Sequence, residues 1–259
     1  MITSPIPILP LPGICYDAGL QRNRGSDRAE NAVESPAADR ETIKAEGAMK
    51  ILEVFDLAIP EIKVIRYARY MDHRGFFAEH FRKDDFATHP QLNFMKDVEF
   101  LQCNESYSKP GTIRGLHFQW NPLMGKLIRT LSGRMTDMVL DIRKGSPSFG
   151  KIISYDMPAG PDADFGEWIW VPPGFAHGNF FLQPTHIEYF CSAQYNPACE
   201  AGISPLAPDI DWSLCATESR MEFDRILSGK PLITDKDRNG HSLSSWVHHP
   251  DSDRFLYRG

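Results

Sequence analysis

The chain has 259 residues, of which 42% are hydrophobic and 24% charged, enough to bury the core of one large domain or two small ones. The formal net charge of −6 argues against nucleic acid as a partner, because proteins that bind it carry clustered basic charge. No run of 18 apolar residues occurs, and the proline-broken N-terminus lacks the basic start of a secretory signal. The sequence therefore predicts neither a membrane span nor export.

The cysteines are odd in number and scattered along the chain, with no C-x-x-C pair. Such a pattern favours free thiols in a reducing cytoplasm over a disulfide framework or a zinc site. We expect them to behave as small buried hydrophobic residues. The five are Cys15, Cys103, Cys191, Cys199 and Cys215.

The chain divides by composition into three parts. Residues 1–48 are largely polar, charged and poor in aromatic residues, which is typical of a disordered extension. Residues 49–245 carry the periodic apolar pattern of a folded domain, and residues 246–259 read as a C-terminal tail. No internal repeat is visible.

Taken in order, the elements of the folded part are mostly strands. Residues 82–89 and 218–226 predict short helices. Residues 98–106 alternate, which places Val98, Phe100, Gln102 and Asn104 on one face. Residues 125–157 contain three strand-like runs, separated at Gly133 and at "KGSPSFG". Residues 167–173 and 186–195 continue the pattern. Short strands at this spacing predict an all-β sandwich, barrel or jelly roll.

One stretch, "GEWIWVPPGFAH", resembles the second half of the cupin signature, with Gly166, Pro172, Gly174 and His177 at the expected spacing. Metal-binding cupins also need two histidines one residue apart, followed by a glutamate, because such sites take three or four ligands. The matching stretch here, "GLHFQW", has His117 but Gln119 in place of the second histidine. A carboxamide replaces imidazole poorly, so we expect no bound metal.

Without a metal, His117 either fills the core or moves a proton. Strict alternation puts Ile113, Gly115, His117 and Gln119 on one face and Arg114 on the other, although a bulge at Gly115 would bring Arg114 to the face of His117. Lys126 and Arg129 follow nearby. Basic groups converging with a histidine would be costly in a core and favour a pocket for an anion or an enolate. Tyr189 is the candidate partner acid, with core packing as the alternative.

Seven stretches that follow one another along the chain resemble the dTDP-4-dehydrorhamnose 3,5-epimerase family of metal-free cupins. The resemblance covers roughly Met49 to Gly240. The stretches are "DHRGFFAEHF", "QCNESYSKPGTIRGLHFQ", "KLIRTLSG", "DIRKGSPSFGK", "WVPPGFAHG", "YFCSAQYNPACEAGI" and "LITDKDRNG".

The resemblance implies a cupin double-stranded β-helix (jelly roll) with short peripheral helices and no cofactor. It implies epimerisation of a nucleotide-diphosphate 4-keto-6-deoxy sugar at C3, C5 or both, through an enolate. It also implies a homodimer whose subunits exchange strands, so that Arg74 serves either its own site or the partner's. Histidine titrates near neutrality and suits the role of base, and tyrosine can return the proton.

Carried over by position, the resemblance assigns the base to His117, its orienting carboxylate to Asp237, the acid to Tyr189 and enolate stabilisation to Lys126. The positions that match substrate-contacting residues are Arg74, Glu79, Gln102, Asn104, Arg114, His177, Glu200 and Lys236.

Some residues depart from the family pattern. Gln194-Tyr195 stands where a tyrosine pair is common, Gly125 stands where a larger polar residue is common, and residues 215–231 form a longer segment than usual. His186 and Glu188 lie near the proposed acid and read as surface residues. The alternatives left open are epimerisation at C3 only, ketoisomerisation, a non-catalytic cupin that binds sugar nucleotides, and a metal-dependent cupin oxygenase.

Overall fold

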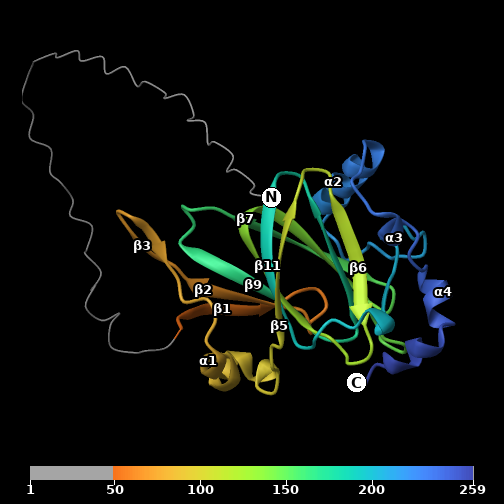
Figure 1. Ribbon diagram of the computed structural model, residues 1–259, viewed down its shortest axis with the longest axis horizontal. Coiled ribbons are helices and arrows are strands. Elements are labelled where there is room, and N and C mark those ends of the chain that lie inside the picture. The colour runs from red at the N-terminus through yellow and green to blue at the C-terminus, as the bar shows by residue number, and fades with distance from the viewer. Residues whose placement is uncertain (1–48, 259) are drawn as a thin grey trace, which may run out of the picture. The chain divides into compact units, whose positions relative to one another are not determined.

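Strands dominate the part of the chain that the computed structural model describes, residues 49–258 (Figure 1). The extension expected to be disordered, residues 1–48, lies outside the described residues. The strands are β1 (Ile51–Asp56), β2 (Lys63–Ala68), β3 (Tyr70–Asp72), β4 (Gly75–Phe77), β5 (Gln102–Ser108), β6 (Ile113–Gln119), β7 (Lys126–Asp141), β8 (Ile152–Ala159), β9 (Phe165–Val171), β10 (Phe175–Phe181), β11 (Thr185–Cys191) and β12 (Glu200–Gly202). The helices are α1 (Lys83–Thr88), α2 (Thr217–Ser228), α3 (Asp235–Arg238) and α4 (Leu243–Val247), with 3-10 turns η2 (Pro90–Met95), η3 (Pro197–Cys199) and η4 (Pro250–Arg254).

Two antiparallel sheets share the long strand β7. Its first half lies between β9 and β11 in a sheet of order β1-β2-β9-β7-β11-β5. Its second half lies between β8 and β10 in a sheet of order β8-β7-β10-β6-β12. A strand that passes from one sheet to the next is a corner of a jelly roll, so the all-β fold expected from the sequence is confirmed.

Gly133 marks that corner, and here the expectation was wrong. The sequence predicted that Gly133 separates two strands, whereas β7 runs through it without interruption. Gly133 has a φ of +92°, and a Cβ there would lie 2.4 Å from the carbonyl oxygen of Pro184. Only glycine tolerates both the left-handed backbone and the close approach, so the residue bends the strand instead of ending it.

The strand β5 begins later than the alternation of residues 98–106 predicts. Val98 and Phe100 pack with Phe81 and Phe190 against the outer face of the first sheet, and the strand starts at Gln102. Gln102 and Asn104 both line the interior cavity described below. The two predicted helices are confirmed, as α1 and α2.

Three apolar clusters hold the layers together. The cluster between the sheets includes Ile128, Val139 and Ile169. A second cluster packs α1 and η2 against the outer face of the first sheet, through residues such as Phe86 and Trp168. The third packs the C-terminal helices against the outer face of the second sheet, the side on which Figure 1 shows α2, α3 and α4.

Packed structure continues past residue 245, where the sequence pattern placed the end of the domain. Trp246 and Phe255 are 1% and 3% exposed and contact Phe118 of β6 edge-on. Burial of one such side chain stabilises the fold by about 2 kcal/mol. Trp246 and Phe255, which the sequence pattern placed in a tail, therefore belong to the third cluster.

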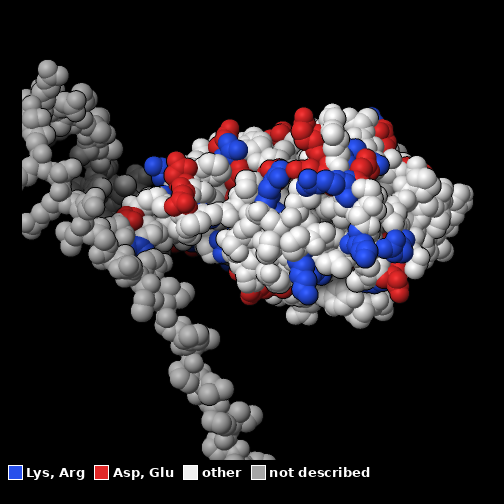
Figure 2. Space-filling model, turned by 90° about the horizontal axis from the view of Figure 1, so that it is seen from above, with Lys and Arg blue, Asp and Glu red and all other residues white. Residues whose placement is uncertain are grey.

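Charges on the described surface are mixed in sign. On the face in Figure 2, Lys and Arg side chains lie beside Asp and Glu, with uncharged surface between them. Arg134, for example, contacts both Asp156 and Glu222. No helix in the described part of the chain is long and apolar enough to cross a membrane. The four cysteines within it are free thiols, and Cys15 lies outside it.

Candidate active site

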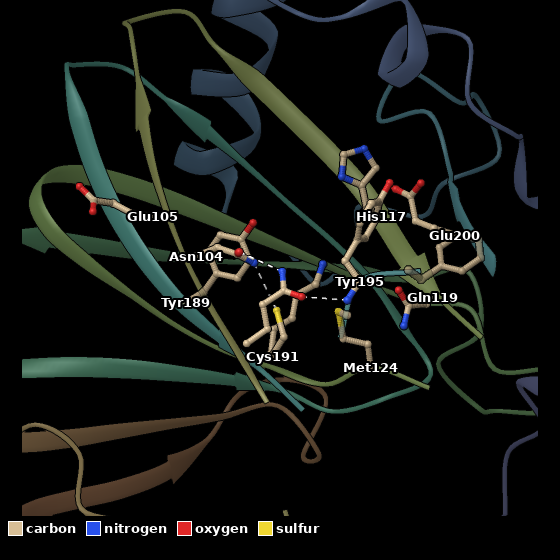
Figure 3. Close-up of a pocket in the computed structure, with 12 residues that line it drawn as sticks. Asn104, Glu105, His117, Gln119, Met124, Tyr189, Cys191, Tyr195 and Glu200 are labelled. Atoms are coloured by element: carbon tan, nitrogen blue, oxygen red, sulfur yellow. Dashed lines mark hydrogen bonds between the residues drawn. The ribbon is translucent and has the colours of Figure 1, made fainter. Parts of the chain in front are cut away.

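A cavity of about 390 Å³ lies between the two sheets, and a second hollow of about 310 Å³ adjoins it. His117, Lys126 and Tyr189 line both, so the two form one continuous site. These side chains come from β6, β7 and β11, that is, from both sheets and the strand they share. Figure 3 shows His117 and Tyr189 in the cavity. The first hollow is also lined by Gln102, Asn104, Glu105, Phe118, Gln119, Met124, Cys191, Tyr195 and Glu200.

His117 pairs with Asp237. Its Nε2 lies 2.6 Å from Oδ1 of Asp237, and the other carboxylate oxygen accepts the backbone N–H of Gly115 at 3.3 Å. Thr234 caps the start of α3 by accepting the N–H of Asp237, which fixes where the carboxylate points. Burial alone would raise the pKa of Asp237, but the hydrogen bonds from His117, Gly115 and Thr234 together hold it below its usual 3.8.

A bulge in β6 places Arg114 on the same side as His117. His117 pairs with His177 of β10 and Arg114 with Asn179, so two residues of β6 oppose the single residue Gly178. Arg114 and His117 both line the second hollow, as the sequence hypothesis of a bulge at Gly115 requires. The guanidinium of Arg114 donates to Ser108 and to the carbonyl of Tyr107.

A second histidine–carboxylate pair lies deeper between the sheets. The Nε2 of His177 is 2.7 Å from Oδ1 of Asp137, whose side chain is fully buried and whose Oδ2 has no partner among the described residues. Burial lowers the pKa of His177 and favours its neutral form. Sequence reasoning missed Asp137, although one carboxylate inside the largely apolar run "MTDMVL" is a sign of a buried polar pair.

Lys126 faces this interior from the first residue of β7. Burial lowers its pKa, while Cys191, Asp137 and Glu200 act in the opposite direction. Its neighbour two positions on, Ile128, belongs to the core between the sheets. Arg129 consequently points to the outer face, where it contacts Glu188 and His80 and takes no part in the cavity.

Tyr189 enters the cavity from β11, in a sheet different from that of His117. Burial raises the pKa of its hydroxyl above the usual 10, so the group stays protonated near neutral pH. Beside it Asn104 accepts a hydrogen bond from Gln102 and contacts the sulfur of Cys191, and Gln102 accepts the N–H of Tyr195 (Figure 3). Gln102 and Asn104, which are predicted to bind substrate, therefore also stabilise the wall of the cavity.

The cationic side of the site is formed by Arg114 and Lys236. Lys236 makes two hydrogen bonds to the carboxylate of Glu200, at 2.7 and 2.9 Å, and the bond to Glu200 raises the pKa of Lys236. Lys236 lines the second hollow and Glu200 the first. An anionic group that enters beside Arg114 and Lys236 would meet two cations, of which Lys236 is partly neutralised by Glu200.

Two predicted site residues lie away from the cavity of their own chain. Arg74 sits at the tip of the β3–β4 hairpin with 78% of its side chain exposed, paired with Asp72. Glu79 pairs with Arg82. His186 and Glu188 point outward from β11, to Glu105 and Arg129 respectively, as expected of surface residues. The remaining predicted residues all line one or both hollows.

Gln119 uses its amide on the backbone. It donates to the carbonyls of Pro122 and Gln194 and accepts the N–H of Asn196. Within residues 49–258 no group of three or more His, Cys, Asp or Glu side chains is arranged to hold a metal ion. The position that carries the second histidine of the metal-cupin motif is thus a structural amide in this chain.

The fold and the site together define a class of protein, a jelly-roll enzyme with a histidine, a tyrosine and a lysine converging in one cavity. Comparison with known proteins gives the family. The family profile described as dTDP-4-dehydrorhamnose 3,5-epimerase matches residues 56–245. The chain belongs to this family, which makes it an isomerase of the carbohydrate-epimerase type.

Individual relatives and solved structures agree with this family match. A dTDP-4-dehydrorhamnose 3,5-epimerase from Sinorhizobium fredii is 38% identical over 65% of this chain and 84% of its own. One from Shigella flexneri is 33% identical over 74% and 96%. The crystal structure of a Legionella pneumophila epimerase in complex with dTDP-4-keto-L-rhamnose superposes with a TM-score of 0.64 at 30% identity, covering 80% of this chain and 99% of that one. A 3'-monoepimerase from Streptomyces bikiniensis in complex with dTDP-quinovose gives a TM-score of 0.61 at 27% identity, covering 74% and 89%.

Proposed function

We propose that the protein epimerises a dTDP-linked 4-keto-6-deoxy sugar at C3, C5 or both. The observation that carries the proposal is the convergence of His117 and Tyr189, from different sheets, on one cavity that also contains Lys126. Epimerisation needs a base and an acid on different sides of one carbon, and a cation near the oxygen on which charge develops. The relatives named as epimerases, and the neighbour with bound dTDP-4-keto-L-rhamnose, supply the substrate class.

In the proposed reaction the C4 ketone acidifies the adjacent C–H bonds. His117 takes the proton, and the electron pair of that bond moves into an enolate whose oxygen Lys126 stabilises. Asp237 orients the imidazole and stabilises the imidazolium that forms, the role of the carboxylate in other histidine–aspartate pairs. Tyr189 returns a proton to the opposite face, and proton exchange with solvent restores both groups. We assign contacts with the rest of the substrate to His177, Asn104 and Gln102.

The diphosphate is proposed to lie at the cationic end, near Arg114 and Lys236. The nucleotide base is proposed to lie against the ring of Tyr195, which lines the first hollow and is 53% exposed. An exposed aromatic ring offers a stacking surface to any base. The family often has a second tyrosine at the position of Gln194. We therefore also propose, as a separate point, that the site prefers thymine over other bases.

We further propose a homodimer in which the β3–β4 hairpin serves the partner's site. The hairpin carries Arg74 away from the cavity of its own chain, Glu79 follows it two residues after β4, and Phe77 on the hairpin is 69% exposed. Exposed apolar side chains next to an arginine suit burial against a second copy of the chain with the cation directed to its diphosphate. The free cysteines in the described part of the chain suit the cytoplasm as the proposed location.

The experiment that tests the reaction is proton NMR in deuterated water with dTDP-4-keto-6-deoxyglucose. The native protein should exchange and invert C3, C5 or both, and the positions that exchange decide between double and single epimerisation. His117→Ala should abolish exchange at both carbons. Undiminished exchange in that variant would remove His117 as the base, and no exchange with the native protein would refute the proposed function.

A further inference from the structure

Gln119 joins two loops in the wall of the cavity, residues 120–125 and residues 192–196. The residue is 3% exposed, and its side-chain Nε2 donates to the carbonyl of Pro122 at 3.0 Å and to that of Gln194 at 3.1 Å. Its Oε1 accepts the N–H of Asn196 at 2.7 Å. Asn196 in turn donates to the carbonyl of Asn121 at 2.7 Å. The two loops are therefore joined to each other twice, once through Gln119 and once directly.

The residue between these two contacts is Tyr195. Its own N–H donates to Oε1 of Gln102 at 2.8 Å, and Gln102 belongs to β5 in the other sheet. Three consecutive residues, 194–196, are thus held by one glutamine from each sheet. Tyr195 remains 53% exposed and lines the cavity together with Glu200, near which Figure 3 shows it.

We propose that Gln119 is a positioning residue for nucleotide binding, which holds Gln194–Asn196 so that Tyr195 presents its ring at the nucleotide end of the cavity. The inference rests on the proposed function for the identity of the ligand. A loop held in its binding conformation before the ligand arrives loses less entropy on binding. The amide is suited to this task, because only a group with two donors and an acceptor can satisfy two carbonyls and one N–H at once.

If Gln119 served packing alone, its substitution would lower the stability of the fold and leave dTDP binding by the folded protein unchanged. The two roles are separated by a double-mutant cycle with dTDP as the ligand, measured by calorimetry on Gln119→Met, Tyr195→Ala and the double variant. Methionine keeps the length of the side chain without its hydrogen bonds. Gln91→Met is the matched control, since Gln91 is exposed in η2 and lines neither hollow of the site.

We expect Tyr195→Ala and Gln119→Met each to weaken dTDP binding by about tenfold, the size of one lost stacking contact. The double variant should bind no more weakly than Tyr195→Ala alone, because Gln119 acts only through that ring. Additive losses, or native affinity in Gln119→Met, would overturn the inference. Absence of dTDP binding by the native protein would instead count against the proposed function, and the two failures are therefore distinguishable.

A second variant covers the case in which Gln119→Met does not fold. In Gln119→Glu the ionised carboxylate faces the carbonyls of Pro122 and Gln194 and can donate to neither. Protonation restores one donor, so dTDP affinity relative to the native protein should recover as the pH falls. A constant ratio of affinities across pH would contradict the positioning role.

Discussion

The Nε2 of His117 lies 2.6 Å from Oδ1 of Asp237, a carboxylate whose other oxygen accepts the N–H of Gly115 in the same strand as the histidine. One carboxylate thereby fixes both the ring of the proposed base and the bulge that carries it. Because the side chain of Asp237 is only 5% exposed, little water competes for either contact. The proposed base is positioned before substrate arrives, which is what proton transfer requires.

Asp237→Asn should lower kcat by about 10²- to 10⁴-fold with a smaller effect on KM. The amide keeps the shape of the side chain but loses the charge that stabilises the imidazolium. Steady-state kinetics would measure this, with Asp235→Asn in the same helix as the control, because Asp235 is exposed and lines neither hollow. A native kcat in Asp237→Asn would separate the carboxylate from the chemistry.

Tyr189→Phe should block inversion and leave deuterium exchange in place. Loss of one hydroxyl leaves the cavity shape nearly unchanged, and His117 still removes and returns a proton on its own side of the carbon. We expect inversion to slow by about 10²- to 10⁴-fold. The ratio of exchange to inversion, followed by NMR in deuterated water, measures this. If both rates fell together, Tyr189 would act before or during deprotonation instead of after it.

The alkaline limit of kcat should be set by Lys126. Its pKa is lowered from 10.5 by burial, whereas burial raises the pKa of Tyr189 above 10. Burial therefore moves the loss of charge by the lysine to lower pH and the loss of the proton by the tyrosine to higher pH, so we expect enolate stabilisation to be lost first. Lys126→Arg should move the alkaline limb to higher pH, since arginine stays charged.

The size of the lysine effect is given by Lys126→Met, which should lower kcat by about 10²- to 10³-fold, as for loss of one group that stabilises a developing oxyanion. Lys50→Arg, at an exposed position, is the control and should leave the pH profile unchanged. An alkaline limb that stays in place in Lys126→Arg would assign it to another group.

Periodicity in the sequence was enough to predict an all-β fold. It was not enough where a single glycine changes the geometry. Gly133 bends β7 between the sheets, and Gly115 shifts the phase of β6, so that Arg114 joins His117 while Ile113 packs with the outer core. Both depend on contacts with distant parts of the chain, at Pro184 and Gly178 respectively, which local patterns do not contain.

Asp137 is a further limit of sequence reasoning. A carboxylate in an apolar strand signals a buried partner, but alternation alone cannot say that the partner is His177, forty residues along the chain. Arg74 and Glu79 are predicted by family resemblance, and their positions away from the cavity come from the structure alone. Tertiary contacts, in both cases, decide what local sequence leaves open.

Gly115→Ala tests how strictly the bulge is required. At Gly115 the φ is +104°, and a Cβ would lie 2.5 Å from the Cα of Gly178 and 2.7 Å from the carbonyl oxygen of His177. Both contacts are with backbone, so β6 and β10 must separate, and the register that brings His177 opposite His117 is disturbed. We expect a loss of about 2–5 kcal/mol in the free energy of unfolding, from left-handed strain and overpacking together.

The control is Gly145→Ala, where φ is +82° but a Cβ would have no neighbour within 4 Å. It carries the backbone strain alone, about 1–2 kcal/mol. Urea unfolding of both variants gives the difference in the free energy of unfolding, and dTDP binding shows whether the displaced strand still presents Arg114 to the ligand. Equal destabilisation of the two variants would mean that β6 moves away at no cost, and the close approach of the two strands would then not be what holds Arg114 and His117 in one site.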